Sequence, residues 1–374
     1  MFRPQIQKIR VLFSIAILNL ALVYIAATSK EYIPKAGLEQ KLKATEIMEN
    51  SLELLYSTSN NIKSEDIYES GVLGVESSSI TTIFDSEDKK MKNSKIACTH
   101  PNFAALVVEM FQEAQLTKND KIAISMTGSL PGANIAVLSA CKSMDLNPVI
   151  ISSVGSSAWG ANEEDFSWLD IEKILYENEI FDMLSVASSI GGENDLGDNL
   201  SDKGIEAIEN IIASKNVEFI NNKNLMESVS KKIEIYNSKD SNYKAFVNIG
   251  GGSASLGYGL GKDSIKVGVI YPIEKKQIYY DGFENSIAKY FLDNDVTFIN
   301  IKSINLLAKN VGLYPPDKSI GVNEGSLFYI ESEFNLYVII ICLLLSIVSI
   351  GGVGIYSHYE IKKRMQEYEP DSII

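Results

Sequence analysis

The chain has 374 residues, of which 45% are hydrophobic and 22% are charged, and its formal net charge is -14. This composition is typical of a globular protein with a sizeable core and excludes the disordered and collagen-like classes. A strongly acidic chain repels nucleic acid on average, so we expect no nucleic-acid partner.

Two apolar stretches, residues 11–27 and 336–356, stand apart from this composition. The first contains one strongly polar side chain, Asn19, and the second contains no charged side chain. Because roughly 20 apolar residues are needed to span a bilayer as a helix, the second stretch is long enough, and the first is at the short end. The first is therefore either an uncleaved anchor, which we favour, or the apolar part of a signal peptide.

Basic flanks predict the orientation of these segments. Three basic residues precede the first stretch and three follow the second, whereas acidic residues precede the second. Lysines that follow the first stretch oppose this pattern, but long domains are translocated largely regardless of charge. We expect a two-pass protein of the cytoplasmic membrane. Both tails (residues 1–10 and 357–374) would be cytoplasmic, the membrane helices would occupy residues 11–28 and 336–356, and the main domain would be extracytoplasmic.

Between the membrane segments, short β-rich runs alternate with amphipathic helices. Strands are predicted at residues 121–126, 148–153, 183–187, 217–220, 245–249, 265–271 and 296–299. Helices are predicted at residues 100–116, 131–144, 167–176, 201–214, 223–236, 283–292 and 303–311. This alternation predicts an α/β domain over residues 63–313, with a mostly parallel sheet flanked by helices, and a linker over residues 314–335.

The segment before this domain, residues 29–62, is expected to contain a juxtamembrane helix. Apolar side chains recur at helical spacing over residues 37–60. The helix either rises from the membrane toward the domain or packs on the domain itself. Further along the chain, Thr99 is a candidate N-cap for the helix with Pro101 in its first turn, and Ser167 with Asp170 resembles a capping box.

Cysteine and histidine are scarce, with three and two residues, respectively. Cys98 and Cys141 could pair outside the cell, but a domain of about 300 residues buries enough apolar surface to fold without a disulfide. The spacing of these residues supports no metal site, and we expect no metal and no cofactor. A Ser-His-Asp triad would have to use His100, since the other histidine lies in the C-terminal tail.

Ligands of open α/β sheets bind at the carboxyl ends of the strands, and four polar loops follow predicted strands. The first loop, residues 125–132, offers Thr127, Gly128 and Ser129 beside a helix N-terminus, where unpaired N–H groups favour an anion. The alternative for this loop is an ordinary turn with Ser129 as the N-cap and Pro131 in the first helical turn.

The second loop, residues 152–162, combines small polar side chains with a tryptophan. Its candidate ligand-binding residues are Ser153, Ser156, Ser157, Trp159 and Asn162. Trp159 would form one wall of the site; alternatively, Trp159 and Trp168 seal the edge of the sheet.

The third and fourth loops, residues 188–197 and 248–257, are rich in glycine. In the third, the carboxylates of Glu193 and Asp195 could hold a cation or act as general bases, and Asn194 is a further ligand-binding candidate, unless the loop is simply solvated. In the fourth, glycines allow backbone N–H groups to approach a ligand closely. The candidates of the fourth loop are Asn248, Gly250, Gly251, Gly252 and Ser253.

Because parallel strands point their carboxyl ends the same way, the four loops are predicted to form one shared site. Its helix N-termini, glycine-rich backbone and tryptophan would suit a carboxylate beside an apolar stem. Nearby acidic candidates are Asp165, Asp170 and Glu172, of which Asp170 is more readily explained as a helix cap.

Four strings in this order, HPNFAALVVEMFQEA, ISMTGSLPGANIAVLSAC, PVIISSVGSSAWGANEEDFSWLDIE and VNIGGGSASLG, resemble the bacterial poly-γ-glutamate system protein family. The resemblance spans roughly residues 95–260. It implies an accessory role in making and exporting a poly-γ-glutamate capsule, with the polymer or its synthesis and export proteins as partners. It implies no catalytic residues.

Two other functions compete with this one. The outer domain could cut or transfer γ-glutamyl bonds, with Ser129 or Ser156 as the nucleophile and Asp165, Asp170 or Asp195 assisting. The shortage of histidine, the commonest general base, weighs against this alternative. The protein could also sense a small ligand, which the short C-terminal tail disfavours.

Overall fold

The computed structural model describes residues 9–58, 73–82, 88–259, 261, 264–278, 280–314, 320–330 and 334–367. The chain divides into two compact units. The first combines Met1–Pro34 with Tyr329–Ile374, and the second is Lys35–Phe328. The predicted cytoplasmic tails lie outside the described residues, apart from residues 9–10 and 357–367, as do parts of the predicted linker.

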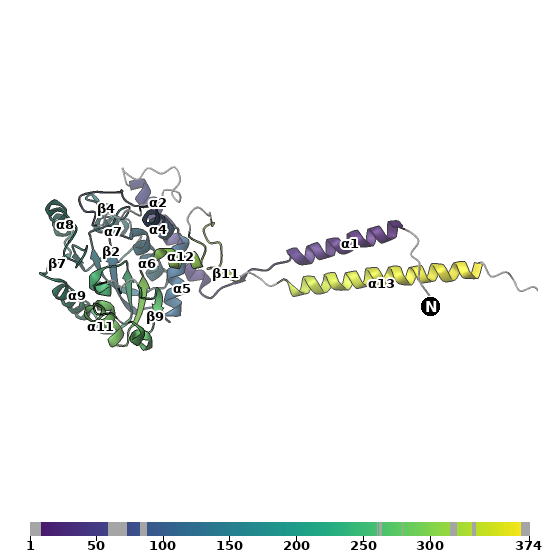
Figure 1. Ribbon diagram of the computed structural model, residues 1–374. Helices are drawn as coiled ribbons and strands as arrows, with labels where there is room; N and C mark the ends of the chain where they lie inside the picture. Colours follow the sequence, from purple (N-terminus) through teal and green to yellow (C-terminus); the bar gives the residue numbers. More distant parts are fainter. Residues whose placement is uncertain are drawn as a thin grey trace, which may run out of the picture. The chain divides into compact units, whose positions relative to one another are not determined.

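The first unit is an antiparallel helical hairpin made of α1 (Ile9–Thr28) and α13 (Leu336–Glu367). The two helices lie side by side (Figure 1), and Ser346 Oγ donates a hydrogen bond to Asn19 Oδ1 between them. Next to the helices, β1 (Ile33–Pro34) pairs with β11 (Tyr329–Ile330). Asn19, the one strongly polar residue of the first apolar stretch, thus finds its partner on the other helix.

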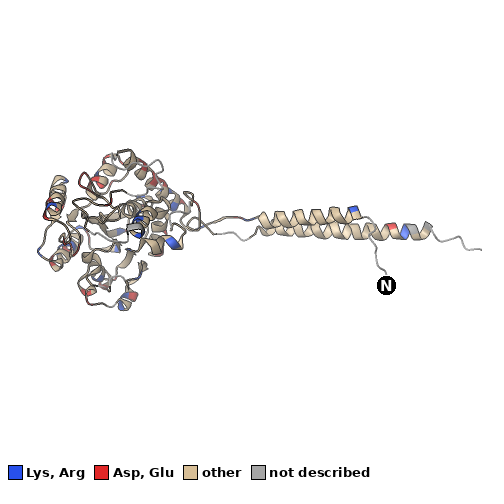
Figure 2. Cartoon of the chain, turned by 45° about the horizontal axis from the view of Figure 1, so that its top comes forward, with Lys and Arg blue, Asp and Glu red and all other residues tan. Residues whose placement is uncertain are grey.

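Both helices of the hairpin are long and apolar enough to cross a membrane, over Ile9–Thr28 and Leu336–Lys363. This is compatible with a two-pass membrane protein. In Figure 2 the charged side chains of the pair gather at one end, where α1 begins and α13 finishes. The first residue of α1 and the last residue of α13 therefore lie at the same end of the helical pair.

The second unit is built on a seven-stranded sheet, which confirms the predicted α/β fold. Its order is β7-β6-β3-β2-β8-β10-β9, with every neighbouring pair parallel except the edge pair β10–β9. The strands are β2 (Lys121–Thr127), β3 (Asn147–Ser153), β6 (Ala187–Ser189), β7 (Glu218–Ile220), β8 (Tyr243–Ile249), β9 (Gly268–Ile270) and β10 (Thr297–Ile301). A separate two-stranded hairpin pairs β4 (Asn162–Glu163) with β5 (Phe166–Ser167).

Helices cover both faces of this sheet (Figure 1). They are α2 (Leu38–Thr58), α4 (Asp88–Thr99), α5 (Asn102–Glu113), α6 (Pro131–Ser143), α7 (Trp168–Glu177), α8 (Asp202–Ser214), α9 (Leu225–Lys239), α10 (Ser253–Leu256), α11 (Ile287–Asp293) and α12 (Ile304–Asn310), with short 3-10 helices at Pro272–Gln277 and Phe283–Asn285. Sequence patterns missed α4 and α10, because neither has a clear apolar stripe.

The central strands are buried on both faces, which explains their continuous apolar runs. Residues 122–126 of β2 are all buried. On one face, Phe246 of β8 stacks on Phe291 of α11 with ring centroids 4.8 Å apart, and Tyr236 of α9 packs edge-on against both. Aromatic pairs of this kind add about 0.5–1.5 kcal/mol each beyond the area that they bury.

Helix α2 belongs to the second unit and does not stand apart as a juxtamembrane element. Its buried stripe, which includes Ala44, Met48 and Leu52, packs against α5 and α6. Lys41 is buried as well, and its Nζ bonds Glu109 Oε2 at 2.7 Å and Leu327 O at 2.8 Å. Of the two alternatives for this segment, the structure therefore supports the helix packed on the domain.

Several local predictions need correction. Thr99 is the last residue of α4 and donates its hydroxyl to Ile96 O, so it does not cap α5, whose N-cap position is Pro101. The strand predicted at residues 183–187 lies instead at Ala187–Ser189. Cys98 and Cys141 are both free and buried in the structure, and they form no disulfide.

Candidate functional site

The sheet has a topological switch point between β2 and β8. From β2 the chain moves outward through β3, β6 and β7, and it then returns to place β8 on the other side of β2. The loops that follow β2 and β8 consequently lead away from each other and leave a crevice at the carboxyl edge. In open α/β sheets this is where ligands bind.

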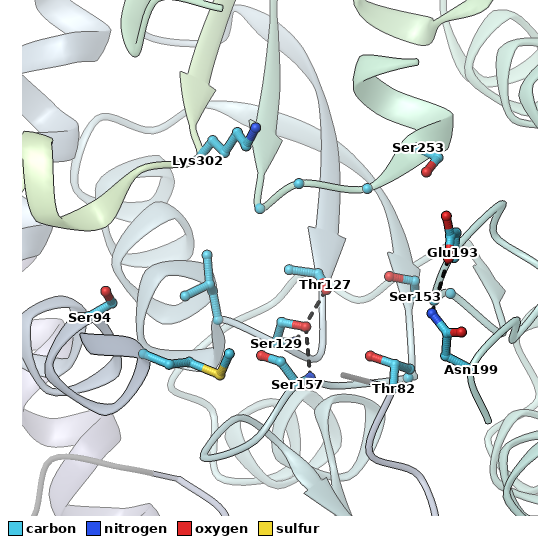
Figure 3. Close-up of a pocket in the computed structure, with 18 of the residues that line it drawn as sticks. Thr82, Ser94, Thr127, Ser129, Ser153, Ser157, Glu193, Asn199, Ser253 and Lys302 are labelled. Atoms are coloured by element: carbon cyan, nitrogen blue, oxygen red, sulfur yellow. Dashed lines mark hydrogen bonds between the residues drawn. The ribbon is translucent and has the colours of Figure 1, made fainter. Parts of the chain in front are cut away.

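A cavity of about 760 Å³ occupies this edge (Figure 3). All four of the predicted loops contribute to it, together with α4 and the segment after β10. The lining residues are Thr82, Lys90, Met91, Ser94, Lys95, Thr127, Ser129, Leu130, Ser153, Gly155, Ser157, Gly191, Gly192, Glu193, Asp195, Asn199, Gly250, Gly251, Gly252, Ser253, Lys302 and Asn305. Loops up to about 120 residues apart in the sequence thus share one cavity, as parallel strands require.

The structure divides the predicted site residues into two groups. Those that line the cavity are Thr127, Ser129, Ser153, Ser157, Asp195, Gly250, Gly251, Gly252 and Ser253. Those outside the lining are Gly128, Ser156, Trp159, Asn162, Asn194 and Asn248. The second group consists mainly of residues that hold the loops in place.

Gly128 and Ser156 join the first loop to the second. A Cβ atom on Gly128 would lie 2.4 Å from Val154 O, so only glycine allows this approach. Ser156 is fully buried, and its Oγ donates to Gly128 O at 3.0 Å. Their roles are thus in packing, and the suggestion of Ser156 as a nucleophile is not supported by its position.

Trp159 and Asn162 also stabilise the conformation of the second loop. Asn162 is fully buried, and its side chain bonds both Val75 N (2.9 Å) and Val75 O (2.8 Å). Trp159 has a positive φ of 63°, and Lys92 Nζ lies 4.5 Å from its ring centroid. Trp159 therefore does not form the cavity wall that the sequence suggested.

The side-chain amides of Asn194 and Asn248 donate hydrogen bonds to neighbouring residues. Asn194 Nδ2 donates to Asp198 Oδ2 at 2.7 Å on the surface. Asn248 is buried, and its Nδ2 donates to Gly250 O at 2.8 Å and to Asn300 Oδ1 at 3.1 Å. The bond to Gly250 helps to fix the start of the glycine run, which itself lines the cavity.

Ser129 is not the N-cap of α6. The N-cap position is Leu130, which makes no side-chain cap bond. Ser129 instead receives a hydrogen bond at its Oγ from Ser157 N (3.0 Å), and its own N–H donates to Thr127 Oγ1 (3.2 Å). Figure 3 shows these three residues close together, joined by the two bonds. The first and second loops therefore present their hydroxyl groups as one cluster.

Asp195 is not an open carboxylate. It is buried, and its Oδ2 lies 2.6 Å from Lys232 Nζ. Ser189 Oγ donates to Asp195 Oδ1 at 2.8 Å, and Ser228 Oγ donates to its Oδ2. A carboxylate saturated in this way stabilises the third loop and is a poor candidate for a cation ligand or a general base.

Three lysines in the lining, Lys90, Lys95 and Lys302, were missed from the sequence. Lys302 directly follows β10, so it obeys the same strand-end rule as the four loops and could have been found with it. Lys90 and Lys95 lie on α4, which no sequence pattern predicted. The charged residues of the described lining are these three lysines, Glu193 and Asp195, and Asp195 is paired with Lys232.

Lys95 is the most deeply buried of the three, with 4% of its surface exposed. Its Nζ donates to Ser157 Oγ at 2.8 Å and to the backbone oxygen of Ser129. Burial lowers the pKa of this amine to about 8. At neutral pH a measurable fraction of Lys95 is therefore uncharged.

The remaining acidic and histidine candidates lie outside the cavity lining. Asp170 forms the predicted capping box with Ser167 and also pairs with Lys215. Asp165 is exposed, and Glu172 is buried under two hydrogen bonds from Ser185. His100 has both ring nitrogens engaged, Nε2 with Ile320 O at 3.0 Å and Nδ1 with Asn102 N at 3.1 Å. A triad through His100 is not supported.

Comparison with protein-family models finds no match to this chain, and a search of curated proteins finds none either.

Proposed function

We propose that the protein is a membrane-anchored accessory component of a poly-γ-glutamate capsule synthesis and export system, and that its cavity binds a carboxylate-bearing ligand. One observation carries the proposal: a chain with a formal charge of -14 lines its switch-point cavity with Lys90, Lys95 and Lys302. Cations gathered in one concave site of an acidic protein favour an anionic ligand locally, against the average field.

The neutral groups of the cavity suit the same ligand. Hydroxyl groups of Thr127, Ser129, Ser153 and Ser253 can donate to carboxylate oxygens. The lining at Gly251 and Gly252 is open, because a Cβ on Gly252 would meet nothing within 4 Å and one on Gly251 would meet only Lys302 Cε at 3.6 Å. A polymer chain could therefore run close to this backbone.

The polymer itself is suggested by the resemblance of four sequence strings to the poly-γ-glutamate system protein family. Each unit of poly-γ-glutamate carries one free carboxylate beside a short apolar stem. Such a chain emerging at the cell surface would meet a domain held outside the cytoplasmic membrane. We therefore assign the partners as the polymer or its synthesis and export proteins.

The orientation is part of the proposal. Basic residues precede the first apolar segment and follow the second, and the start of α1 and the end of α13 lie at the same end of the helical pair. Protease added to intact spheroplasts should then digest the domain between the segments and spare both termini. Digested termini with a protected domain would reverse the orientation.

Ligand binding is tested with the full-length protein in nanodiscs and fluorescent oligo-γ-glutamate of about ten units. We expect Lys302→Gln and Lys90→Gln each to weaken binding by up to about fivefold, and binding to weaken as salt is raised. Lys276→Gln is the matched control, since Lys276 is an exposed lysine outside the cavity. Equal loss in the control variant would mean that binding reflects surface charge alone.

The choice of polymer needs a second comparison. Oligo-α-glutamate of the same length has the same charge with a different spacing of its carboxylates. We expect weaker binding of the α-linked chain, because groups fixed along a cavity match one spacing better than another. Equal affinity for both chains would leave an anion-binding site but remove the assignment to poly-γ-glutamate.

A further inference from the structure

The deepest cation of the cavity touches a serine hydroxyl. Lys95 Nζ lies 2.8 Å from Ser157 Oγ, and both residues line the cavity while remaining almost fully buried. In the described part of the chain, the partners of Lys95 are this hydroxyl and the backbone oxygen of Ser129, both of them neutral. A buried amine held by neutral acceptors is unusual, because buried charges are normally paired.

Hydrogen bonds between the first and second loops hold this serine in place. Ser157 N donates to Ser129 Oγ at 3.0 Å, and Ser129 N donates to Thr127 Oγ1 at 3.2 Å. Lys95 in turn bonds the Ser129 backbone, so the amine and the hydroxyl are held against the same two loops. Figure 3 shows Ser157 beside Ser129 in the cavity.

We propose that Ser157 and Lys95 form a serine–lysine dyad and that the protein catalyses acyl transfer from an amide of the ligand that occupies this cavity. The proposal rests on the proposed function for the class of acyl group, a γ-glutamyl unit with a free carboxylate. In this dyad Ser157 is the nucleophile and Lys95 the general base, a pairing that requires no histidine.

The chemical steps balance with water as the only co-reactant. Neutral Lys95 takes the proton of Ser157 Oγ as that oxygen bonds to the amide carbonyl carbon, and the carbonyl π pair moves to its oxygen. As the tetrahedral species collapses, the C–N bond breaks and the Lys95 ammonium gives its proton to the leaving amine. Water, or a second amine in a transfer reaction, then releases the acyl group from Ser157 by the same route.

The lowered pKa of Lys95 supports this role. With a pKa of about 8, a much larger fraction of the amine is neutral near pH 7.5 than in an ordinary lysine, which is almost wholly charged there. Burial is the main cause of the shift, so the enclosure of Lys95 favours the neutral amine that a general base requires.

Neighbouring serines are poorer nucleophiles. Ser156 Oγ is fully buried, bonds Gly128 O and Ser157 O at 3.0 Å each, and does not line the cavity. Ser129 lines the cavity, but Lys95 bonds its backbone oxygen, and its hydroxyl accepts from Ser157 N. Ser157 is thus the one of these three whose hydroxyl meets the amine.

The test is covalent labelling of the full-length protein in nanodiscs with a fluorophosphonate probe, followed by mass spectrometry of the modified peptide. We expect the label on Ser157, at a rate that rises with pH through a midpoint near 8. Labelling of Ser129 or of Ser156 would overturn the assignment, and so would a wild-type protein that takes no label.

Variants of Lys95 distinguish a general base from a lysine that has only a structural role. Lys95→Arg keeps a positive charge but cannot accept a proton, and loss of a general base typically slows a reaction by on the order of 100-fold. Lys92→Met on the same helix and Ser156→Ala on the same loop are the matched controls, and both should label as wild type does. If Lys95→Arg fails to fold in thermal unfolding, the site of labelling in the wild type still decides the proposal.

Two measurements test catalysis by the dyad separately from binding of the polymer. The first is release of aminomethylcoumarin from its γ-glutamyl amide, which Ser157→Ala should abolish. The second is binding of oligo-γ-glutamate, which Ser157→Ala should leave within about twofold, because one hydroxyl among several is removed. Wild-type binding without labelling or release would overturn the dyad alone. Labelling and release without polymer binding would overturn the proposed function alone.

Discussion

The carboxylate of Asp195, in the third loop of the cavity, lies 2.6 Å from the ammonium group of Lys232, and both side chains are buried. Ser189 bridges the pair, since its Oγ donates to Asp195 Oδ1 at 2.8 Å and accepts from Lys232 Nζ at 3.0 Å. The pair ties the loop after β6 to helix α9. A buried ion pair therefore holds in place the third loop, which contributes to the cavity lining.

Breaking this pair should destabilise the protein strongly. Asp195→Asn leaves Lys232 buried without its counter-ion, and losses of about 3–5 kcal/mol are typical of such changes. The measurement is thermal unfolding of the full-length protein in detergent. Asp145→Asn, which removes the exposed partner of Lys118, is the matched control and should change little. A similar small change for Asp195→Asn would show that the pair is not buried in solution.

The double substitution Asp195→Leu with Lys232→Met extends this prediction. Replacing both charges by apolar side chains removes the desolvation cost as well as the attraction. We expect the double variant to unfold at a higher temperature than Asp195→Asn. If it unfolds at a lower temperature, the hydrogen bonds of the serines contribute more than the ion pair.

Glu172 should make the stability of the domain depend on pH. Burial raises the pKa of Glu172 from 4.5 to about 7, while Ser185 bonds it through its N–H (3.0 Å) and Oγ (2.8 Å). The folded state therefore holds this proton more tightly than the unfolded chain does. The stabilising contribution is complete below about pH 4.5 and is lost as the pH rises through 7.

Between pH 5 and pH 8 the wild type should lose roughly 2 kcal/mol of stability from this group. Glutamine at position 172 cannot titrate. As the pH rises, the unfolding temperature of Glu172→Gln should therefore increase relative to that of the wild type. A constant difference across this range would contradict a raised pKa for Glu172.

Substitutions of glycines at the edge of the cavity should fall into two classes: some should destabilise the fold, and others should only block entry of the ligand. Gly251 is exposed and a Cβ there would make only an ordinary contact with Lys302, so Gly251→Val should fold normally but obstruct the backbone edge of the cavity and abolish function. Ser129→Trp should act in the same way. Gly128→Ala is the contrasting variant, because its Cβ would lie 2.4 Å from Val154 O and should lower the unfolding temperature. Normal ligand binding by Gly251→Val would place the ligand elsewhere.

The cysteines of the domain should be unreactive until the protein unfolds. Cys98 and Cys141 are free and buried, and burial raises the pKa of Cys98 to about 11. Ellman's reagent should therefore modify neither thiol in the folded protein and both in denaturant, and a reducing agent should not change the unfolding temperature. Fast reaction of Cys98 in the folded protein would contradict this burial.

The sequence allowed the sheet to be predicted because its strands and helices differ in period and length. The continuous apolar run of β2 and the capping box of Ser167 with Asp170 are local signals, and both were found. Strand β6 was displaced in the prediction because its residues, Ala187–Ser189, are small and polar, and only their burial between β3 and β7 makes them a strand. Tertiary packing, and not local sequence, therefore determines the position of β6.

The location of the candidate site was predictable, but its individual lining residues were predictable only in part. The strand-end rule found the four loops, since it depends only on strand direction. It could not tell a lining side chain such as Ser157 from a packing one such as Ser156, because both lie in one polar run and differ only in which way they point. Lys95 could not be predicted as a lining residue, because its helix is placed beside the cavity by packing between elements that are distant in the sequence.

The central claim is that a carboxylate polymer occupies the cavity at the switch point between β2 and β8. Hydrogen exchange of the full-length protein in nanodiscs, with and without oligo-γ-glutamate, tests it most directly because it locates the bound chain. We predict slower exchange in peptides that cover residues 127–133, 250–257 and 302–305, and no change in α9 and α11. Protection confined to α9 and α11, or no protection anywhere, would contradict the claim.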